Sequence, residues 1–378
     1  MKLLELHVLQ TVVPSNLNRD DTGSPKDALF GGVRRARISS QAQKRAVRVA
    51  FREWLLLDSK ARAVRTKRVM SELVRRLGDS GVPADKAELA VENALNALGF
   101  GVKDRKTEYL LFLGARELDR LADLLLTHLE SLAATETKGK KKAEVDAELK
   151  KALESVLDGG KAVDLALFGR MLADRPELAR DAAAQVAHAI STHKVDREFD
   201  FYTAVDDLNP REETGAGMMG DVEFYSATLY RYALVDLQKL LENLQGDKEL
   251  ALQGALAFLK AFTLTLPSGK QNTFAAHNPP LFVAFRAGAG LPRNLATAFE
   301  HPVYPRDGMA LSAVSAEALV KEWQKFDRAY GSLDPEWKAA LNLTEADGSK
   351  LSPVCPLVPG LPELEAKAKE ALQALLEV

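Results

Sequence analysis

Apolar side chains alternate with polar ones at the start of the chain and predict a strand over residues 2–13. The apolar positions are Leu4, Leu6 and Val8, a period of two that is typical of β-structure. Residues 14–38 then lose this period and are rich in Gly, Pro, Asn, Asp and Ser, which predicts a long irregular segment. Loops of that length in a compact protein are commonly functional.

A helical period begins near residue 40. The apolar positions that share one helical face are Val47, Ala50, Phe51, Trp54 and Leu55. Ser40 is the expected N-cap, because Gln43 stands three residues later and would complete a capping box. The pattern therefore predicts an amphipathic helix that starts sharply at this serine.

Further elements follow from the same two periods. Residues 60–130 and 143–157 have helical patterns and predict an inserted helical region. The other predicted strands are 162–168, 222–236 and 281–285, and the other predicted helices are 177–191, 237–264 and 363–376. Residues 192–221 have almost no regular pattern and predict a second long excursion.

The predicted order is strand, helix, insertion, strand, helix, excursion, strand, helix, strand. Mixed strands and helices with large insertions indicate an α+β protein. A four-stranded ferredoxin-like sheet is one arrangement that fits this order, although periodicity alone does not single it out.

Composition places the chain among ordinary globular proteins. Of its 378 residues, 46% are apolar and 28% are charged. One cysteine, Cys355, excludes an internal disulfide framework and a cysteine-based zinc site, and suits a reducing cytoplasm. No apolar run is long enough to span a bilayer, and the N-terminal stretch lacks the features of a secretory signal. We therefore expect a cytoplasmic location.

The formal net charge of −2 conceals a strong asymmetry. Residues 1–80 contain 17 basic and 8 acidic residues, whereas the remainder contains 34 basic and 45 acidic ones. Between Ala28 and Arg52 there are seven basic residues and no acidic one. Segregated charge of this kind produces a local positive field, which favours a polyanionic partner.

The segment 16–52 combines glycines, hydroxyl groups and cations around a helix N-terminus, where free N–H groups attract anions. Its candidate phosphate ligands are Lys26, Arg34, Arg35, Arg37, Ser39, Ser40, Gln41, Lys44, Arg45 and Arg48. No Walker loop is present. The simpler interpretation is the solvated basic face of an ordinary capped helix.

This segment also resembles the corresponding segment of a known protein family. The runs LNRDD, KDALFGG and RRARISSQAQKRAVR resemble the signature of the CasC family, the Cas-seven type backbone subunits of type I-E CRISPR surveillance complexes (Cascade). The runs GKAVDLALFGRM, AHAISTHKVDREFDFYTAVDDL and GKQNTFAAHNP follow in the expected order. The resemblance extends over residues 1–305, and the C-terminal part resembles the family only loosely.

The resemblance implies a hand-shaped protein. A ferredoxin-like (RRM-like) palm would comprise residues 1–58, 161–194 and 223–378, the last with the C-terminal helices. A helical fingers subdomain would occupy residues 59–160. A protruding thumb loop would occupy residues 195–222.

The resemblance also implies a function in antiviral defence. Several copies would stack along the CRISPR RNA spacer, hold its phosphate backbone, kink it at regular intervals and present its bases to target DNA. The expected partners are CRISPR RNA, target DNA through that RNA, other copies of the chain, and the large, small, 5′-handle-binding and RNA-processing subunits of Cascade. A recruited helicase-nuclease would act on the assembled complex, and the chain itself would be non-catalytic, with no cofactor or metal.

Matching positions carry the family's RNA contacts onto Lys26, Ser39, Gln41, Lys44, Arg45 and Arg48, with Arg19 in the same block. Met171 matches a methionine wedge beside the kinked nucleotide, and Phe201 and Tyr202 match an aromatic pair of the thumb, although the first of the pair is Trp in a relative. Lys270 and Asn272 would contact RNA or seat a thumb. Core packing is the ordinary alternative for each apolar residue in this set, and it is our expectation for Tyr230 and Tyr232.

Two enzyme hypotheses remain beside the scaffold. The carboxylate pairs Asp20-Asp21 and Asp206-Asp207 suggest a metal-dependent ribonuclease, for which carboxylates must converge in space. Turn formation explains adjacent aspartates equally well, and His188 and His193 are spaced for loop anchoring rather than for a shared helical face. The third hypothesis is an enzyme that binds a small anion at the helix N-terminus beginning at Ser40.

Overall fold

The computed structural model describes residues 1–133, 145–172, 175–203 and 219–377. The chain divides into two compact units. Unit 1 comprises Met1–Trp54, Gln185–Asp236 and Ala255–Val378, and unit 2 comprises Leu55–Ala184 and Leu237–Gly254. Each unit has its own hydrophobic core.

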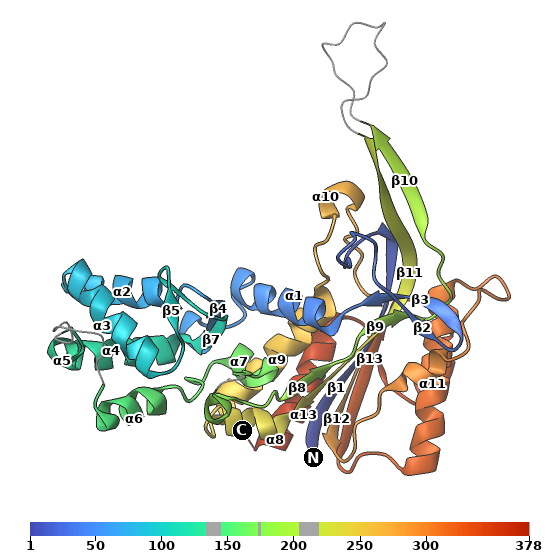
Figure 1. The fold of residues 1–378 in the computed structure, drawn as a ribbon. Coiled ribbons are helices and arrows are strands. Elements are labelled where there is room, and N and C mark those ends of the chain that lie inside the picture. Colours follow the sequence, from blue (N-terminus) through green and yellow to red (C-terminus); the bar gives the residue numbers. More distant parts are fainter. Residues whose placement is uncertain (134–144, 173–174, 204–218, 378) are drawn as a thin grey trace, which may run out of the picture. The chain divides into compact units, whose positions relative to one another are not determined.

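Unit 1 is built on a large sheet with β1 (Lys2–Ser15) at its centre (Figure 1). β1 pairs antiparallel with β11 (Met219–Asp236) and with β12 (Phe282–Ala289). The predicted strands at 2–13, 222–236 and 281–285 are therefore confirmed. The strand order is β14-β13-β12-β1-β11-β9-β3-β2, where the others are β2 Asp27–Phe30, β3 Val33–Ile38, β9 Ala189–Ser191, β13 Glu336–Asn342 and β14 Leu357–Val358.

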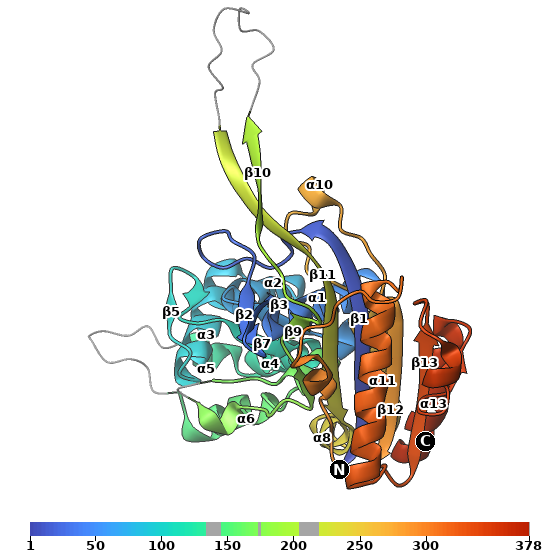
Figure 2. The same cartoon turned by 90° about the vertical axis from the view of Figure 1, so that its right-hand side faces the viewer.

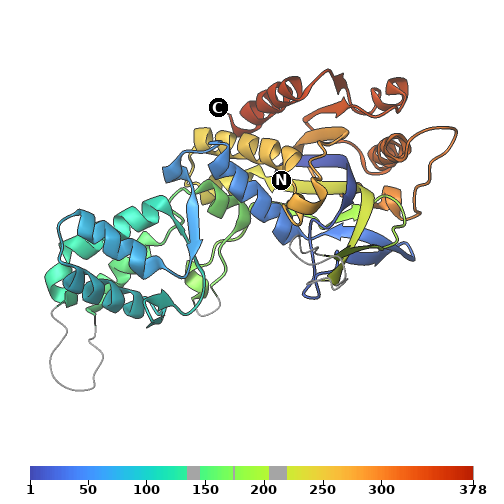
Figure 3. The same cartoon turned by 90° about the horizontal axis from the view of Figure 1, so that it is seen from above.

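Helices cover both faces of this sheet (Figures 2 and 3). α11 (Leu311–Tyr330) lies on one face, and α13 (Leu361–Leu376) lies on the other against β12 and β13. β1 is consequently buried on both faces, and two of its buried polar residues have internal partners: His7 bonds to Tyr230 and Glu5 accepts from Tyr232. The expectation that both tyrosines pack in the core is confirmed.

The second predicted excursion is partly regular. β10 (Glu198–Thr203) pairs antiparallel with the start of β11, in a register that places Phe201 opposite Asp221. The resulting hairpin extends away from the rest of the sheet (Figure 1). The prediction of an irregular segment is wrong for these strands, because their hydrogen-bonding partners are far apart in sequence. Asp206 and Asp207 lie outside the described residues.

Unit 2 is mainly helical, as predicted for residues 60–130 and 143–157. Its main helices are α2 (Val69–Asp79), α3 (Ala84–Ala97), α4 (Ala115–Thr127) and α6 (Ala147–Val156). They enclose a leucine- and alanine-rich core. Its smaller elements are α5 (Leu129–Ala133), η1 (Ser59–Ala61), η2 (Pro176–Leu178) and strands β4 (Ala63–Thr66), β5 (Val102–Lys103), β6 (Lys106–Thr107) and β7 (Leu111–Gly114).

Two predicted elements are wrong, and a third is interrupted. Residues 162–168 form helix α7 (Val163–Phe168), since a short run buried on every side has no diagnostic period. Residues 177–191 contain β8 (Ala184–Val186) and β9 instead of a helix, because pairing with β11 and β3 overrides alanine's helical propensity. The helix predicted at 237–264 is divided into α8 (Leu237–Asn243) and α9 (Lys248–Leu264).

The remaining helical segments are short and lie in unit 1. They are α10 (Gln271–Phe274), η3 (Leu295–Phe299) and α12 (Gly348–Leu351). Among the described residues, no helix has the length and apolar character that crossing a membrane requires.

Candidate nucleic-acid interface

The basic helix α1 (Ser40–Glu53) begins one residue earlier than the sequence suggested. Ser39, not Ser40, is the N-cap, and its hydroxyl oxygen accepts from the Ala42 N–H at 3.3 Å. Gln43 does not complete a capping box. Its amide lies in the core, where it donates to the Ala187 carbonyl at 2.9 Å and accepts from Arg231 at 3.2 Å. These bonds fix α1 against the sheet.

One side of α1 faces the core through Val47 and Phe51, and the opposite side is cationic. The residues on that cationic side are Gln41, Lys44, Arg45, Arg48 and Arg52, which we call the α1 stripe. Their spacings of three, four and seven place them along one helical face. Partial burial lowers the pKa of the Lys44 ammonium group, so an anion beside it would restore the stability of its charged form.

The segment before α1 forms a hairpin of β2 and β3, although the sequence predicted an irregular loop. Gly31 and Gly32 form its turn with φ of 59° and 76°. These are the positive values that a tight two-residue hairpin turn requires, so the Gly-Gly pair was the available signal. The hairpin places Arg34 outward, where it forms an ion pair with Asp27.

Arg35 is a correction to the predicted phosphate ligands. Its side chain is fully buried, and its guanidinium donates to the carbonyls of Phe30, Ser191 and Phe299 at 2.7–3.2 Å. Alternation along β3 puts Arg34 and Arg35 on opposite faces, and Arg35 is the buried one. Arg37 follows on the same face as Arg35 but is only half-buried. We therefore assign Arg35 to the fold.

Lys26 and Arg37 lie together beside a residue that the sequence did not nominate. Arg37 contacts Nδ1 of His188 at 3.0 Å and donates to the Asp27 carbonyl at 2.8 Å. Desolvation, followed by the charges of Arg37 and Lys26, lowers the pKa of His188. His188 thus lies in the positive field of these two cations, a position that its spacing from His193 did not predict.

The predicted residues of the 266–279 loop lie close to the first loop of the chain. A Cβ at Gly269 would fall 2.4 Å from the Leu17 carbonyl oxygen, so glycine permits this close approach. Lys270 follows with φ of 52°, and its side chain and that of Asn272 are exposed. Arg19, from the first loop, is also exposed.

Met171 belongs to unit 2, and its side chain is 89% exposed. The residue before it is anchored firmly: Arg170 forms a buried ion pair with Glu117 at 3.0 Å. Its guanidinium also donates to the carbonyls of Leu157 and Leu178. A long apolar side chain is therefore presented to solvent from a fixed backbone, which is unlike a core methionine.

The β10–β11 hairpin carries exposed aromatic groups. Phe201 and Tyr202 are 62% and 45% exposed, so neither is a core residue. Phe199, which the sequence analysis did not nominate, is 66% exposed and shares the Phe201 face of the strand. Aromatic rings on an extended hairpin are suitable surfaces for stacking with bases.

Asp20 and the two histidines considered for catalysis have structural partners. Oδ1 of Asp20 accepts from the backbone N–H groups of Thr22 and Ser24, at 2.9 and 3.0 Å, and closes a turn. His193 bonds through Nδ1 to the Lys194 carbonyl and through Nε2 to the Thr228 N–H. Within the described residues, no group of three or more His, Cys, Asp and Glu could hold a metal ion.

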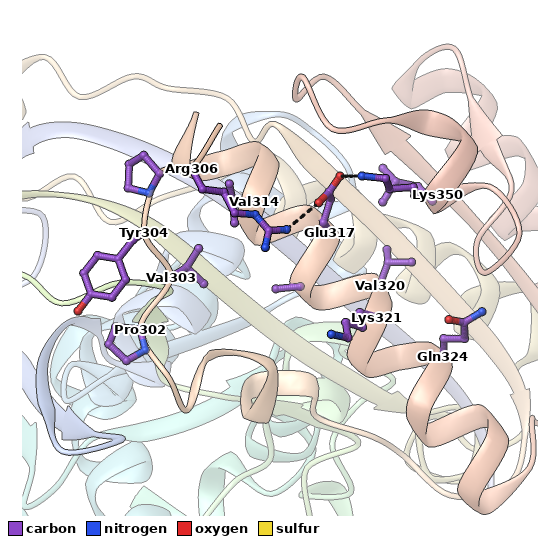
Figure 4. A pocket seen from close by; sticks show the side chains of 13 residues that line it. Pro302, Val303, Tyr304, Arg306, Val314, Glu317, Val320, Lys321, Gln324 and Lys350 are labelled. Atoms are coloured by element: carbon purple, nitrogen blue, oxygen red, sulfur yellow. Dashed lines mark hydrogen bonds and ion pairs between the residues drawn. The ribbon is translucent and has the colours of Figure 1, made fainter. Parts of the chain in front are cut away.

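A hollow of about 560 Å³ lies between α11 and the segment 302–306. Figure 4 shows Glu317 there between Arg306 and Lys350, with ion pairs of 3.0 and 2.8 Å. One carboxylate faces two cations here, so the cluster keeps one net positive charge. The residues lining this hollow are not among the predicted RNA contacts.

The geometry defines an α+β protein with a cationic helix face in one unit and an exposed aromatic hairpin. A model of the CT1975-like protein family matches residues 4–354, and the chain belongs to that family. No curated protein matches it.

Two solved structures are similar over nearly their whole length. A chain of "CRISPR RNA-guided surveillance complex, pre-nicking" is 33% identical, with 98% of this chain and 100% of that chain covered and a TM-score of 0.85. A chain of "CRISPR RNA-guided surveillance complex" is 28% identical, with 98% and 99% covered and a TM-score of 0.74.

Proposed function

We propose that this chain is an RNA-binding backbone subunit of a CRISPR RNA-guided surveillance complex, of the CasC type found in type I-E Cascade. Several copies assemble along the CRISPR RNA spacer in the cytoplasm, hold its phosphates, kink it at intervals and expose its bases to target DNA. The other Cascade subunits complete the particle, and cleavage belongs to the recruited helicase-nuclease.

One observation carries this proposal. The chain is 33% identical, over 98% of its length, to a chain of an RNA-guided complex. Its α1 stripe supplies the sequence-independent phosphate binding that a subunit accepting any guide needs.

The sheet of unit 1 supports a ferredoxin-like palm. Its strands β12-β1-β11-β9 are neighbours in that order, with α1 among the elements between β1 and β9 in sequence and α9 among those between β11 and β12. This is the order expected of a β-α-β-β-α-β fold. Unit 2 would supply the fingers, and the β10–β11 hairpin would supply the base of the thumb.

We assign the RNA contacts to residues that are accessible in this fold. The phosphate ligands are Arg19, Lys26, Arg34, Arg37, Ser40, Gln41, Lys44, Arg45, Arg48, Lys270 and Asn272. Ser39, which the sequence also predicted, is buried as the N-cap of α1 and is left to the fold, like Arg35. Met171, Phe201 and Tyr202 act at the bases. Apolar and aromatic groups of this kind separate or stack bases without reading their sequence.

Electron microscopy of the chain co-expressed with a CRISPR RNA tests the proposal. We expect a ribonucleoprotein in which copies repeat along the RNA with a constant step. A chain that purifies without RNA and remains monomeric when RNA is added would contradict it.

The non-catalytic part of the proposal has its own test. Purified protein is incubated with labelled CRISPR RNA and Mg²⁺ or Mn²⁺, and we expect the RNA to remain intact. Cleavage that EDTA prevents, and that Asp20→Ala or Asp207→Ala abolishes, would identify a metal-dependent ribonuclease instead.

A further inference from the structure

A groove of about 1050 Å³ runs beside the α1 stripe, and all of its lining residues belong to unit 1. One wall is α1, from Ala42 to Trp54, and the other is the segment 264–279. Residues 17–20 close one end. This volume is at the upper end of the range for small-molecule sites, so the groove has room for a nucleotide.

The groove has a mixed lining, in which apolar side chains stand beside polar and cationic ones. Leu17, Val49, Leu264 and Leu266 are among its apolar lining residues. Its cations are Arg19, Arg45, Arg52 and Lys270. Apolar side chains beside several positive charges fit an anionic ligand that also has a flat apolar part.

Two carboxylates, Asp20 and Glu53, face these four cations, so the groove keeps a net positive charge. Asp20 accepts the hydrogen bonds of its own turn. Glu53 pairs with Arg52 at 3.5 Å, and both side chains are more than half exposed, so that pair is weak. In the described part of the chain, Arg45 and Lys270 have no carboxylate within ion-pairing distance.

Trp54 lines the groove at the last turn of α1 and is 43% exposed. Trp323, by contrast, points from α11 into the core and is 1% exposed. Leu264, across the groove, is also 40% exposed. Trp54 and Leu264 are thus exposed beside three arginines. A planar aromatic group could pack against these two side chains while neighbouring phosphates pair with the arginines.

We propose that this groove binds an unpaired base of single-stranded RNA, with Trp54 as the stacking surface and Arg45 and Arg52 on the neighbouring phosphates. The inference rests on the proposed function, because the phosphates would enter from the α1 stripe. It adds a base-binding subsite to that function. The subsite would accept any base, because every base has a face that can stack on an aromatic ring. Arg45 belongs to both surfaces and joins them.

The test uses tryptophan fluorescence and two probes, a short oligouridylate and an abasic phosphodiester of equal length. Oligouridylate should quench part of the emission of the wild-type chain, and the abasic probe should bind without that quenching. Trp54→Phe should remove the quenching while retaining most of the affinity. Trp54→Ala should weaken oligouridylate about 10-fold and leave the abasic probe unchanged.

The outcomes separate this subsite from the function on which it rests. If Trp54→Ala binds both probes like the wild type while Lys44→Ala with Arg48→Ala weakens both, the subsite is wrong and RNA binding stands. If neither probe binds the wild type, the proposed function fails as well. If Trp54→Ala binds RNA normally but no longer assembles with other subunits, the groove is a protein-docking site and the inference is overturned.

Discussion

At the scale of single residues, the surroundings of a cation decide its role. Arg34 and Arg35 are adjacent in a basic run, yet one is exposed and the other is enclosed by carbonyl oxygens. Charge and spacing could nominate both, but only the register of β3 distinguishes them. His188 shows the converse case, because three-dimensional proximity alone places it in the cationic cluster.

His188 should couple RNA binding to pH. Its pKa is lowered in the free protein, partly by Arg37 and Lys26, and an RNA phosphate beside these cations would raise it again. RNA affinity should therefore increase as the pH falls below about 6.5, by at most about 10-fold per pH unit for one coupled proton. Fluorescence anisotropy with a short RNA between pH 8 and 5.5 measures this effect.

The matched controls for this prediction are two histidine variants. His188→Gln should lose the additional affinity at low pH, whereas His301→Gln, which alters another exposed histidine of unit 1, should retain it. An identical pH profile for the wild type and His188→Gln would show that His188 does not face the RNA.

At the scale of elements, the α1 stripe should determine the salt dependence of RNA binding. Each phosphate contact to a single strand contributes about 0.7 to the slope of log affinity against log salt concentration. Lys44→Ala with Arg48→Ala should reduce that slope by about 1.4, measured from binding curves at several salt concentrations. Lys321→Ala with Lys325→Ala, which removes the same charge from α11, should leave the slope unchanged.

The sequence predicted an element well where the pattern of buried and exposed positions repeats over a long segment. The strands 2–13 and 222–236 and the amphipathic α1 were predicted because their patterns persist for ten residues or more. It failed for 162–168, where helix and strand produce the same short apolar run, and for 177–191, where the partners of β8 and β9 are distant in sequence. Nonlocal pairing leaves little trace in local composition.

The candidate site also contains residues that the sequence could predict and residues that it could not. The α1 stripe could be predicted, because helical spacing alone aligns Lys44, Arg45 and Arg48. The inward side chain of Arg35, the position of His188 and the open groove at Trp54 could not, because each depends on segments that meet only after folding.

At the scale of the whole molecule, a buried histidine in the central strand should make unit 1 sensitive to acid. His7 is enclosed by Tyr230, Tyr232 and Trp323, and burial, with the charge of Arg286, lowers its pKa to about 3. The unfolded chain takes up this proton below about pH 6.5, so stability decreases by about 1.4 kcal/mol per pH unit from there toward pH 3.

Denaturant unfolding of the wild type and His7→Gln at several pH values tests this. The variant should be less stable near neutrality, because it disturbs a packed site, but its loss of stability between pH 6.5 and 4 should be shallower. Parallel pH profiles would mean that other groups dominate the acid response.

Each unit has its own hydrophobic core, so the last prediction concerns the stability of unit 2 alone. Removing one partner of a buried ion pair leaves the other charge uncompensated, so Arg170→Ala should destabilise unit 2 by about 3–5 kcal/mol. Met171→Ala, one residue away and almost fully exposed, should change stability by less than about 0.5 kcal/mol.

Hydrogen exchange resolved by segment can follow both units in one experiment. Because the core of unit 1 is made by its own sheet and α11, amides of β1 and β12 should keep their protection in Arg170→Ala while those of α3 and α4 lose it. Equal loss in both units would show that they unfold as one cooperative structure, whereas loss in neither would show that the Glu117–Arg170 pair contributes little to the fold.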